Sequence, residues 1–154
     1  MYRNIVVGTD GSETAKIAVS HAMALAQAGG GTLHIVHAYQ NVSLGMAAIA
    51  AGSGGPAVDL DRLNDGLQEN GAAVVAQVQA EAAAGGVECR THVVSGEPAD
   101  VLVTVAEKVG ADLIVVGNRG MSGVKRFMLG SVPNRISHHC PCNLLIVDTA
   151  HQQA

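Results

Sequence analysis

The stretch LIVVGNRGMSGVKRFMLGS, residues 113–131, decides the fold of this chain of 154 residues. Its first four residues are apolar and mostly β-branched, which predicts a short buried strand. A glycine-rich run with no acidic residue follows, and it contains Arg119, Lys125 and Arg126. Such a run at the end of a buried strand either turns a corner or holds an anion. The order of the other elements bears on this choice.

Four other segments also have the pattern of strands. Residues 4–10 are short and apolar, like residues 113–116, so both are predicted to lie in the centre of a sheet. Residues 32–39 are predicted to form another strand. Residues 87–94 alternate between apolar and polar side chains, which is typical of a sheet edge. The last strand is predicted at residues 143–147, whose sequence is NLLIV.

Helical patterns lie between the strands. The first helix can be capped by Asp10 or Ser12. Residues 41–57 are poor in charge and are expected to be a connection without regular structure. A long helix is predicted over residues 59–84, and a short one over residues 131–138. The residues of the long helix expected to face the core are Leu60, Leu63, Leu67, Val74 and Val78.

Alternating strands and helices predict an α/β fold with right-handed crossovers. We expect an open, doubly wound, Rossmann-like sheet of five parallel strands in the order 3-2-1-4-5, with helices on both faces. One domain is expected over residues 1–150, followed by a short tail at 151–154. In this order the loops after the first and fourth strands meet at the switch point, where such folds bind ligands.

Composition narrows the function. Aromatic residues make up 2% of the chain and Trp is absent, which disfavours a stacking platform for single-stranded nucleic acid. The net charge is −4, yet residues 113–147 contain no Asp or Glu and carry about +4. A basic segment in an acidic chain indicates a local anion site and no nucleic-acid partner. No apolar run reaches the roughly 18 residues of a membrane span. Three cysteines without a secretory signal favour the cytoplasm.

The glycines of the basic segment suit a nucleotide. Gly117 ends the strand and lets a flat ligand lie against the backbone, and Gly120 can take a positive φ and turn the loop. Gly130 and Ser131 open a helix whose free N–H groups favour a phosphate. Arg119 can add charge. Asp10, after the first strand, can bind ribose hydroxyls or Mg²⁺.

The spacing G-x2-G-x9-G-S, set between DLIVV and VPNRISHHCPCNLLIV, resembles the nucleotide-binding signature of the universal stress protein family. The opening NIVVGTDGSETAKIAVSHAMALA is also similar to that family, so the likeness spans nearly the whole chain. The resemblance implies a dimeric stress-response sensor or regulator that binds an adenine nucleotide, most commonly ATP, and that is not an enzyme.

The resemblance also implies roles for single residues. Asp10 would contact the ribose and the metal-phosphate region, with Gly8 and Thr9 lining the adenine pocket. Backbone groups around His37 would bond adenine. The remaining residues would border the ribose or surround the phosphates; they are Val116, Gly117, Gly120, Gly130, Ser131 and Val132.

One position departs from the family pattern. After G-S-V the ATP-binding members usually have Ser or Thr, whose hydroxyl reaches the terminal phosphates, and this chain has Pro133. Proline removes the hydroxyl and an N–H donor. Asn134 is a substitute donor. Binding of a nucleotide is expected to survive, with ATP, AMP and cyclic AMP all open as the preferred ligand.

Other functions are kept as alternatives. A slow Mg²⁺-dependent ATP hydrolase would use Asp10, the one nearby carboxylate, although no hydrolase motif is present. A nucleotide-free dimeric interaction module is the second alternative. The run HHCPC, residues 138–142, contains zinc-ligand types, but it is better explained by a helix end and small buried cysteines.

The last strand predicts a partner. NLLIV at a sheet edge has no Lys or Pro to block pairing, and a bare apolar edge aggregates. Pairing with the same strand of a second copy would cover it, giving a homodimer with two-fold symmetry. The family resemblance implies the same dimer.

Overall fold

The computed structural model describes residues 1–154 except 53, 56, 120–128 and 150–154. Five parallel strands form one sheet in the order β3-β2-β1-β4-β5, which confirms the predicted fold and order. β3 and β5 are the edges. The strands are β1 (Asn4–Gly8), β2 (Thr32–Tyr39), β3 (Cys89–Ser95), β4 (Leu113–Gly117) and β5 (Asn143–Val147).

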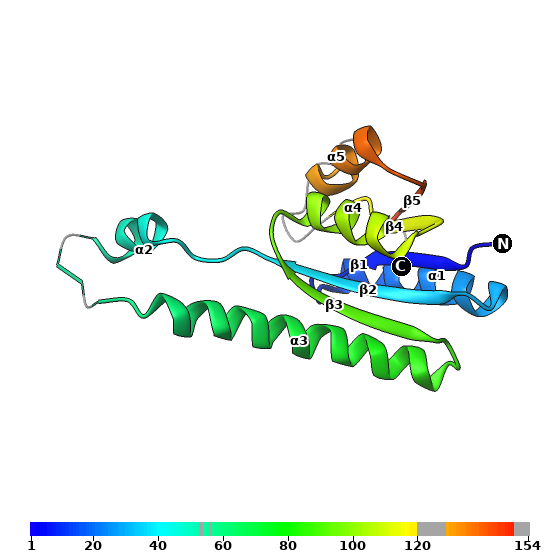
Figure 1. Ribbon diagram of the computed structural model, residues 1–154, viewed down its shortest axis with the longest axis horizontal. Coiled ribbons are helices and arrows are strands. Elements are labelled where there is room, and N and C mark those ends of the chain that lie inside the picture. Colours follow the sequence, from blue (N-terminus) through cyan, green and yellow to red (C-terminus); the bar gives the residue numbers. More distant parts are fainter. Residues whose placement is uncertain (53, 56, 120–128, 150–154) are drawn as a thin grey trace.

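Helices cover both faces of the sheet (Figure 1). α1 (Glu13–Gly29) and α3 (Leu60–Ala84) pack on one face. α4 (Pro98–Val109) and α5 (Ser131–His139) pack on the other. Ser12 caps α1, because its hydroxyl accepts a hydrogen bond from the amide of Ala15, and Asp10 does not cap the helix.

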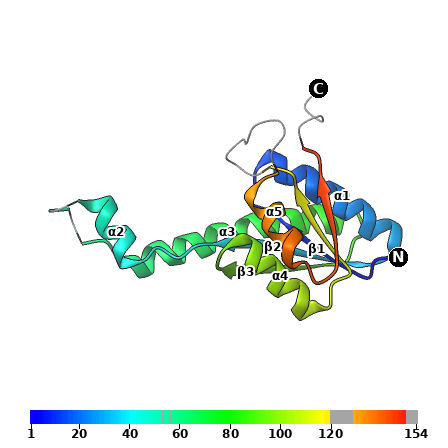
Figure 2. The same ribbon diagram turned by 90° about the horizontal axis from the view of Figure 1, so that it is seen from above.

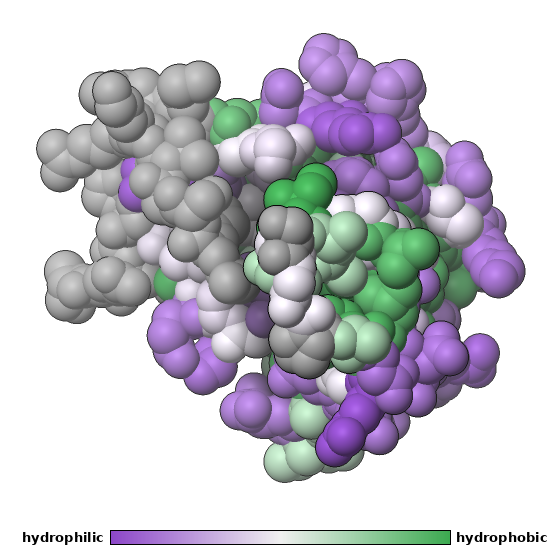
Figure 3. Space-filling model, turned by 90° about the vertical axis from the view of Figure 1, so that its left-hand side faces the viewer, coloured by the Kyte–Doolittle hydropathy of each residue, from purple (hydrophilic) through white to green (hydrophobic). Residues whose placement is uncertain are grey.

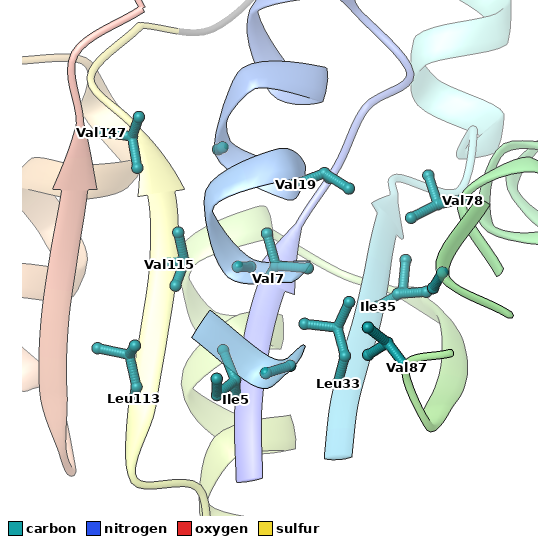
Figure 4. Packing of buried hydrophobic residues seen from close by; sticks show 14 of the residues in the cluster. Ile5, Val7, Val19, Leu33, Ile35, Val78, Val87, Leu113, Val115 and Val147 are labelled. Atoms are coloured by element: carbon teal, nitrogen blue, oxygen red, sulfur yellow. The ribbon is translucent and has the colours of Figure 1, made fainter. Parts of the chain in front are cut away.

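Side chains on the central strands alternate between two apolar cores. Ile5 and Val7 of β1 point toward α1 and α3, together with Leu33 and Ile35 of β2 (Figure 4). Val6 faces the opposite core under α4. All five side chains are almost fully buried. Burial on both faces explains why these strands read as continuous apolar runs.

The connection after β2 differs from the prediction. Residues 44–51 form a helix, α2 (Leu44–Ala51), where a connection without regular structure was expected. Ser43 caps this helix by accepting from the amide of Met46. The run LGMAAIAA consists mostly of strong helix formers, and this propensity, together with the cap, accounts for the helix.

The inward face predicted for α3 is wrong in its first half. α2 and the start of α3 project away from the sheet, so Leu63 is 46% exposed (Figures 1 and 2). Leu60 and Leu67 are half-buried. Contact with the core begins at Gly71 and continues through Val75, Val78 and Ala82, and Val74 is half-buried. The apolar periodicity predicted the helix correctly, but it did not show that the first half of the helix extends beyond the edge of the sheet.

The projecting segment has an apolar surface. Leu44, Met46 and Ile49 of α2 are 73%, 59% and 85% exposed, and Figure 3 looks onto this side of the molecule, where apolar surface is gathered. Among the described residues, no helix is both long and apolar enough to cross a membrane.

Candidate functional site

A cavity of about 150 Å³ opens at the carboxyl ends of the central strands, between the loops after β1 and β4. This is the switch point of the sheet, where the strand order reverses. The lining residues come from both loops, from β2 and from α1, α4 and α5. They are Gly8, Thr9, Asp10, Ser12, Ala15, Val36, Ala38, Pro98, Leu102, Val116, Gly117, Arg119 and Val132.

The loop after β1 is held by its own hydrogen bonds and by β2. The Thr9 amide donates to the carbonyl of Val36 over 2.9 Å, which extends the pairing of β1 and β2 by one residue. The Thr9 hydroxyl accepts from the amide of Gly11 at 3.2 Å. Oδ1 of Asp10 accepts from the amide of Ser12 at 2.9 Å, and Asp10 is exposed. The turn therefore presents the Asp10 carboxylate at the mouth of the cavity.

His37 lies on the other side of the sheet. Its ring lies next to Gly71 of α3. The ring nitrogen Nδ1 is hydrogen-bonded to the carbonyl oxygen of Thr9 at 2.9 Å. Because strand side chains alternate, Val36 and Ala38 are the β2 residues that line the cavity. The His37 side chain thus braces the loop from behind.

The cavity has one apolar wall. Val36, Leu102 and Val116 are buried and belong to the core under α4. A Cβ atom on Gly8 would lie 3.0 Å from Cδ1 of Leu102, so a side chain there would push Leu102 aside. Pro98, at the first turn of α4, borders the same wall. Apolar walls with a few polar groups at one end are typical of small-molecule sites.

The end of the cavity formed by the exit of β4 and the first turn of α5 carries one basic side chain. Arg119 and Val132 line it, at the exit of β4 and in the first turn of α5. α5 starts at Gly130 without any side-chain cap, whereas α1, α2, α3 and α4 each have one. The first amides of α5 therefore keep donor capacity for a ligand.

Two glycines at this end are tightly enclosed. A Cβ atom on Gly117 would lie 3.1 Å from Cγ2 of Thr149, and one on Gly130 would lie 3.1 Å from the carbonyl oxygen of Asn118. Neither glycine has a positive φ. Close approach of neighbouring backbone and side chains, rather than unusual dihedral angles, accounts for these two glycines.

Pro133 is buried in the first turn of α5, where proline is well tolerated. The amide of Asn134 donates to the carbonyl of Gly130 at 3.1 Å, so it belongs to the helix. Ser131 and Asn134 are exposed and do not line the cavity. Gly120, Lys125 and Arg126 lie outside the described residues.

The structure thus brings seven predicted residues to the cavity: Gly8, Thr9, Asp10, Val116, Gly117, Arg119 and Val132. Sequence reasoning missed Ser12, Ala15, Val36, Ala38, Pro98 and Leu102. Alternation along β2 could have pointed to Val36 and Ala38 as neighbours of His37 on the opposite face. The contributions of Pro98 and Leu102 depend on how α4 crosses the sheet, for which the sequence carries no local signal.

The cysteines after α5 lie away from the cavity. The thiols of Cys140 and Cys142 both donate to the carbonyl of Asn143. Burial and the adjacent Cys140 raise the pKa of Cys142 to about 11, so this thiol stays protonated at neutral pH. Within the described part of the chain, no group of three or more His, Cys, Asp or Glu side chains is arranged to hold a metal ion.

Comparison with known proteins gives a family match. Residues 1–148 match the universal stress protein family. The universal stress protein YxiE of Bacillus subtilis is 31% identical over 147 residues, covering 96% of this chain and 99% of that protein. The universal stress protein MJ0531 of Methanocaldococcus jannaschii is 33% identical, with 96% and 82% covered. A crystal structure of a universal stress protein in complex with cAMP is 33% identical, with a TM-score of 0.68 over 97% of this chain and 98% of the other.

Proposed function

The chain belongs to the universal stress protein family, and we propose that it binds an adenine nucleotide in the cavity between β1 and β4. The observation that carries this proposal is the composition of the two ends of the cavity. One end has a buried apolar wall, and the other has Arg119 and an uncapped helix N-terminus. A nucleotide has the matching halves, a flat base and an anionic phosphate.

In this proposal the base lies against Val36, Ala38 and Leu102. The backbone around His37, at the end of β2, bonds the base edge. The ribose lies between the Asp10 carboxylate and Gly117. A side chain on Gly8 or Gly117 would crowd the cavity lining, which supports a ligand that lies close to the backbone.

The phosphates are proposed to lie at the start of α5, near Gly130, Ser131 and Val132, with Arg119 supplying positive charge. Gly130 and Ser131 do not line the cavity, so this part of the proposal rests on the uncapped helix start. The homologous protein crystallised with cAMP supports an adenine ligand with at least one phosphate.

Pro133 bears on which nucleotide is preferred. It fills the first turn of α5 without a hydroxyl or an N–H, and Asn134, the proposed substitute, has its amide in a helical bond. We therefore propose that affinity depends mainly on the base, the ribose and the first phosphate. ATP, AMP and cyclic AMP then bind with similar affinity, and Mg²⁺, which the Asp10 carboxylate would hold, adds affinity for ATP.

The output of the protein is proposed to be regulation and not chemistry. Asp10 is the one carboxylate among the described lining residues, and in this proposal it is engaged by the ribose and Mg²⁺. A base that activates water for hydrolysis needs a free, positioned acceptor. We propose a homodimer joined through β5, working as a stress sensor in the cytoplasm, where its three free cysteines stay reduced.

Titration of the purified protein with ATP, ADP, AMP and cyclic AMP, with and without Mg²⁺, tests the proposal. A ligand at 100 times its dissociation constant stabilises the fold by about 2.7 kcal/mol, which a thermal-shift series detects. Wild type is expected to shift with every adenine nucleotide and with no pyrimidine nucleotide. Absence of a shift with all of them at millimolar concentration would exclude the proposed function.

A pair of variants separates loss of binding at the proposed site from any effect that a glycine-to-glutamate change has elsewhere in the protein. Gly130→Glu places a carboxylate at the start of α5, where even a Cβ atom is close to Asn118, and is expected to abolish the shift. Gly66→Glu makes the same change on α3, where a Cβ atom meets nothing within 4 Å, and should keep the shift. Retention of nucleotide binding by Gly130→Glu would contradict the placement of the phosphates.

A further inference from the structure

Three chain segments meet at the backbone of Asn118, the residue directly after β4. The Asn118 amide donates to the carbonyl of Val147 at 2.8 Å, at the end of β5. The Asn118 carbonyl accepts from the amide of Gly130 at 3.0 Å, at the start of α5. One residue therefore holds the exit of β4, the end of β5 and the N-terminus of α5 together.

The side chain of Asn118 adds three hydrogen bonds to the same junction. Oδ1 accepts from the Thr149 amide at 3.0 Å and from the Thr149 hydroxyl at 2.8 Å. Nδ2 donates to Oδ1 of Asp148 at 2.9 Å. A backbone amide can only donate and a carboxylate can only accept, so these partners determine which way the Asn118 amide group points. Thr149 is 2% exposed, so its two bonds to Asn118 are largely shielded from solvent, whereas the bond to Asp148 is exposed.

The junction borders the end of the cavity that carries Arg119. Gly117 and Arg119, on either side of Asn118, both line the cavity. Cγ2 of Thr149, held by Asn118, packs 3.1 Å from where a Cβ atom on Gly117 would lie. Because the Gly130 amide is bound to Asn118, the amides left to bind an anion are those of the residues that follow it in α5.

We infer that Asn118 is a positioning residue for the phosphate of the bound nucleotide, an inference that rests on the proposed function. It touches no ligand atom in this arrangement. It acts by holding the Gly117 backbone and the start of α5 at a set separation, with Asp148 and Thr149 as its supports. The asparagine amide offers an acceptor oxygen to Thr149 and a donor nitrogen to Asp148 on two separate atoms, and the longer glutamine would displace both by one methylene.

An exchange of donor and acceptor tests the role. Asn118→Asp keeps the acceptor for Thr149 but turns an oxygen toward the Asp148 carboxylate, so two anions face each other. Asp148→Asn on its own keeps an acceptor for Asn118. The double variant Asn118→Asp with Asp148→Asn restores one donor and one acceptor with their places exchanged. All three are compared with wild type by calorimetric titration with adenosine and with AMP.

The ratio of the affinities for AMP and adenosine is the decisive measurement. Asn118→Asp is expected to weaken AMP by about tenfold, the effect of about 1.4 kcal/mol, while adenosine changes little. Asp148→Asn and the double variant are expected to bind AMP within about threefold of wild type, since both keep a donor-acceptor pair. Melting temperatures without ligand report any loss of folding.

Each contrary result has a distinct meaning. Unchanged AMP affinity in Asn118→Asp would overturn the inference and leave the proposed function standing. Equal losses for adenosine and AMP would show a merely structural role and overturn it as well. Failure of the double variant to recover AMP binding would overturn the pairing with Asp148. A wild type that binds neither ligand would overturn the proposed function and this role with it.

Discussion

Nδ1 of His37 lies 2.9 Å from the carbonyl oxygen of Thr9, although 28 positions separate them in the chain. His37 is on the face of the sheet that packs against α3, and Thr9 lines the cavity that opens on the other side. Both residues are more than nine-tenths buried. The loop that carries Asp10 is thus supported by a side chain that never reaches the cavity.

Replacement of His37 by leucine is expected to destabilise the fold and weaken nucleotide binding. It leaves the Thr9 carbonyl without this buried donor, which costs about 1–3 kcal/mol. His37→Asn keeps a side-chain N–H near the place of Nδ1 and should retain part of both properties. Urea unfolding and nucleotide titration measure the two effects. Full nucleotide affinity in His37→Leu would contradict a supporting role for the ring.

Two glycines of α3 are expected to respond with opposite signs to the same substitution. A Cβ atom on Gly71 would lie 2.7 Å from Cδ2 of His37 and 2.8 Å from Cγ1 of Val93, so Gly71→Ala overpacks the interface by about 1–3 kcal/mol. At Gly66 a Cβ atom meets nothing within 4 Å, and Gly66→Ala should stabilise the helix by up to about 1 kcal/mol. Chemical unfolding of both variants checks the signs. Equal stabilisation of both would show that α3 shifts freely on the sheet.

Acid is expected to destabilise the fold through a histidine pair. Nδ1 of His34 lies 3.1 Å from Nε2 of His92, and the two rings stack with centroids 5.3 Å apart. Burial lowers the pKa of both histidines from 6.5. Nearby His92 and Arg90 lower the pKa of His34 further. Lys108 and Arg90 do the same for His92. Glu88 opposes it weakly at His34.

The direction of the pH effect follows from the lowered pKa values. In the unfolded chain these histidines take up protons near pH 6.5, whereas in the folded chain they do so only at lower pH. Their contribution to the free energy of unfolding is therefore fully present above pH 6.5 and is lost as the pH falls below it. The slope reaches at most about 1.4 kcal/mol per pH unit for each histidine. His92→Gln should flatten the profile between neutral and mildly acidic pH, whereas His138→Gln, on the exposed side of α5, should leave it unchanged. Identical profiles for both variants would rule out the pair as the source.

The proposed dimer can be tested at the free edge of β5. The Asn143 amide donates to Asp112, and the Val147 carbonyl accepts from the Asn118 amide, so alternate residues of β5 bond β4. By this alternation the amide of Ile146 points away from β4, toward the edge of the sheet. Ile146→Pro would remove an N–H needed for pairing with a second copy while keeping the bonds to β4.

Sedimentation at several concentrations is expected to show a dimer for wild type and a monomer for Ile146→Pro. Ile146→Ala is the matched control, because it shortens the partly buried side chain and keeps the amide. It should remain a dimer. A wild type that sediments as a monomer throughout the concentration series would exclude pairing through β5.

The sequence predicted the central strands correctly because both of their faces are buried. The runs at Ile5–Val7 and at residues 113–116 are apolar because both faces of the sheet are covered, and this identified the central strands and the switch point between them. Gly117 lines the cavity, and a Cβ atom on Gly117 or on Gly130 would lie 3.1 Å from a neighbouring atom, so close approach leaves little room for a side chain at either position.

The sequence by itself thus determined the strand order, the crevice and the two loops that meet there, because strand burial and glycine spacing are local signals. The tertiary structure decided which side chains enter the cavity. The His37 ring lies on the opposite face of the sheet, whereas Leu102 and Pro98 line the cavity. The first half of α3 does not pack on the sheet. These outcomes depend on where one element crosses another, and the crossing is set by packing between residues far apart in the chain.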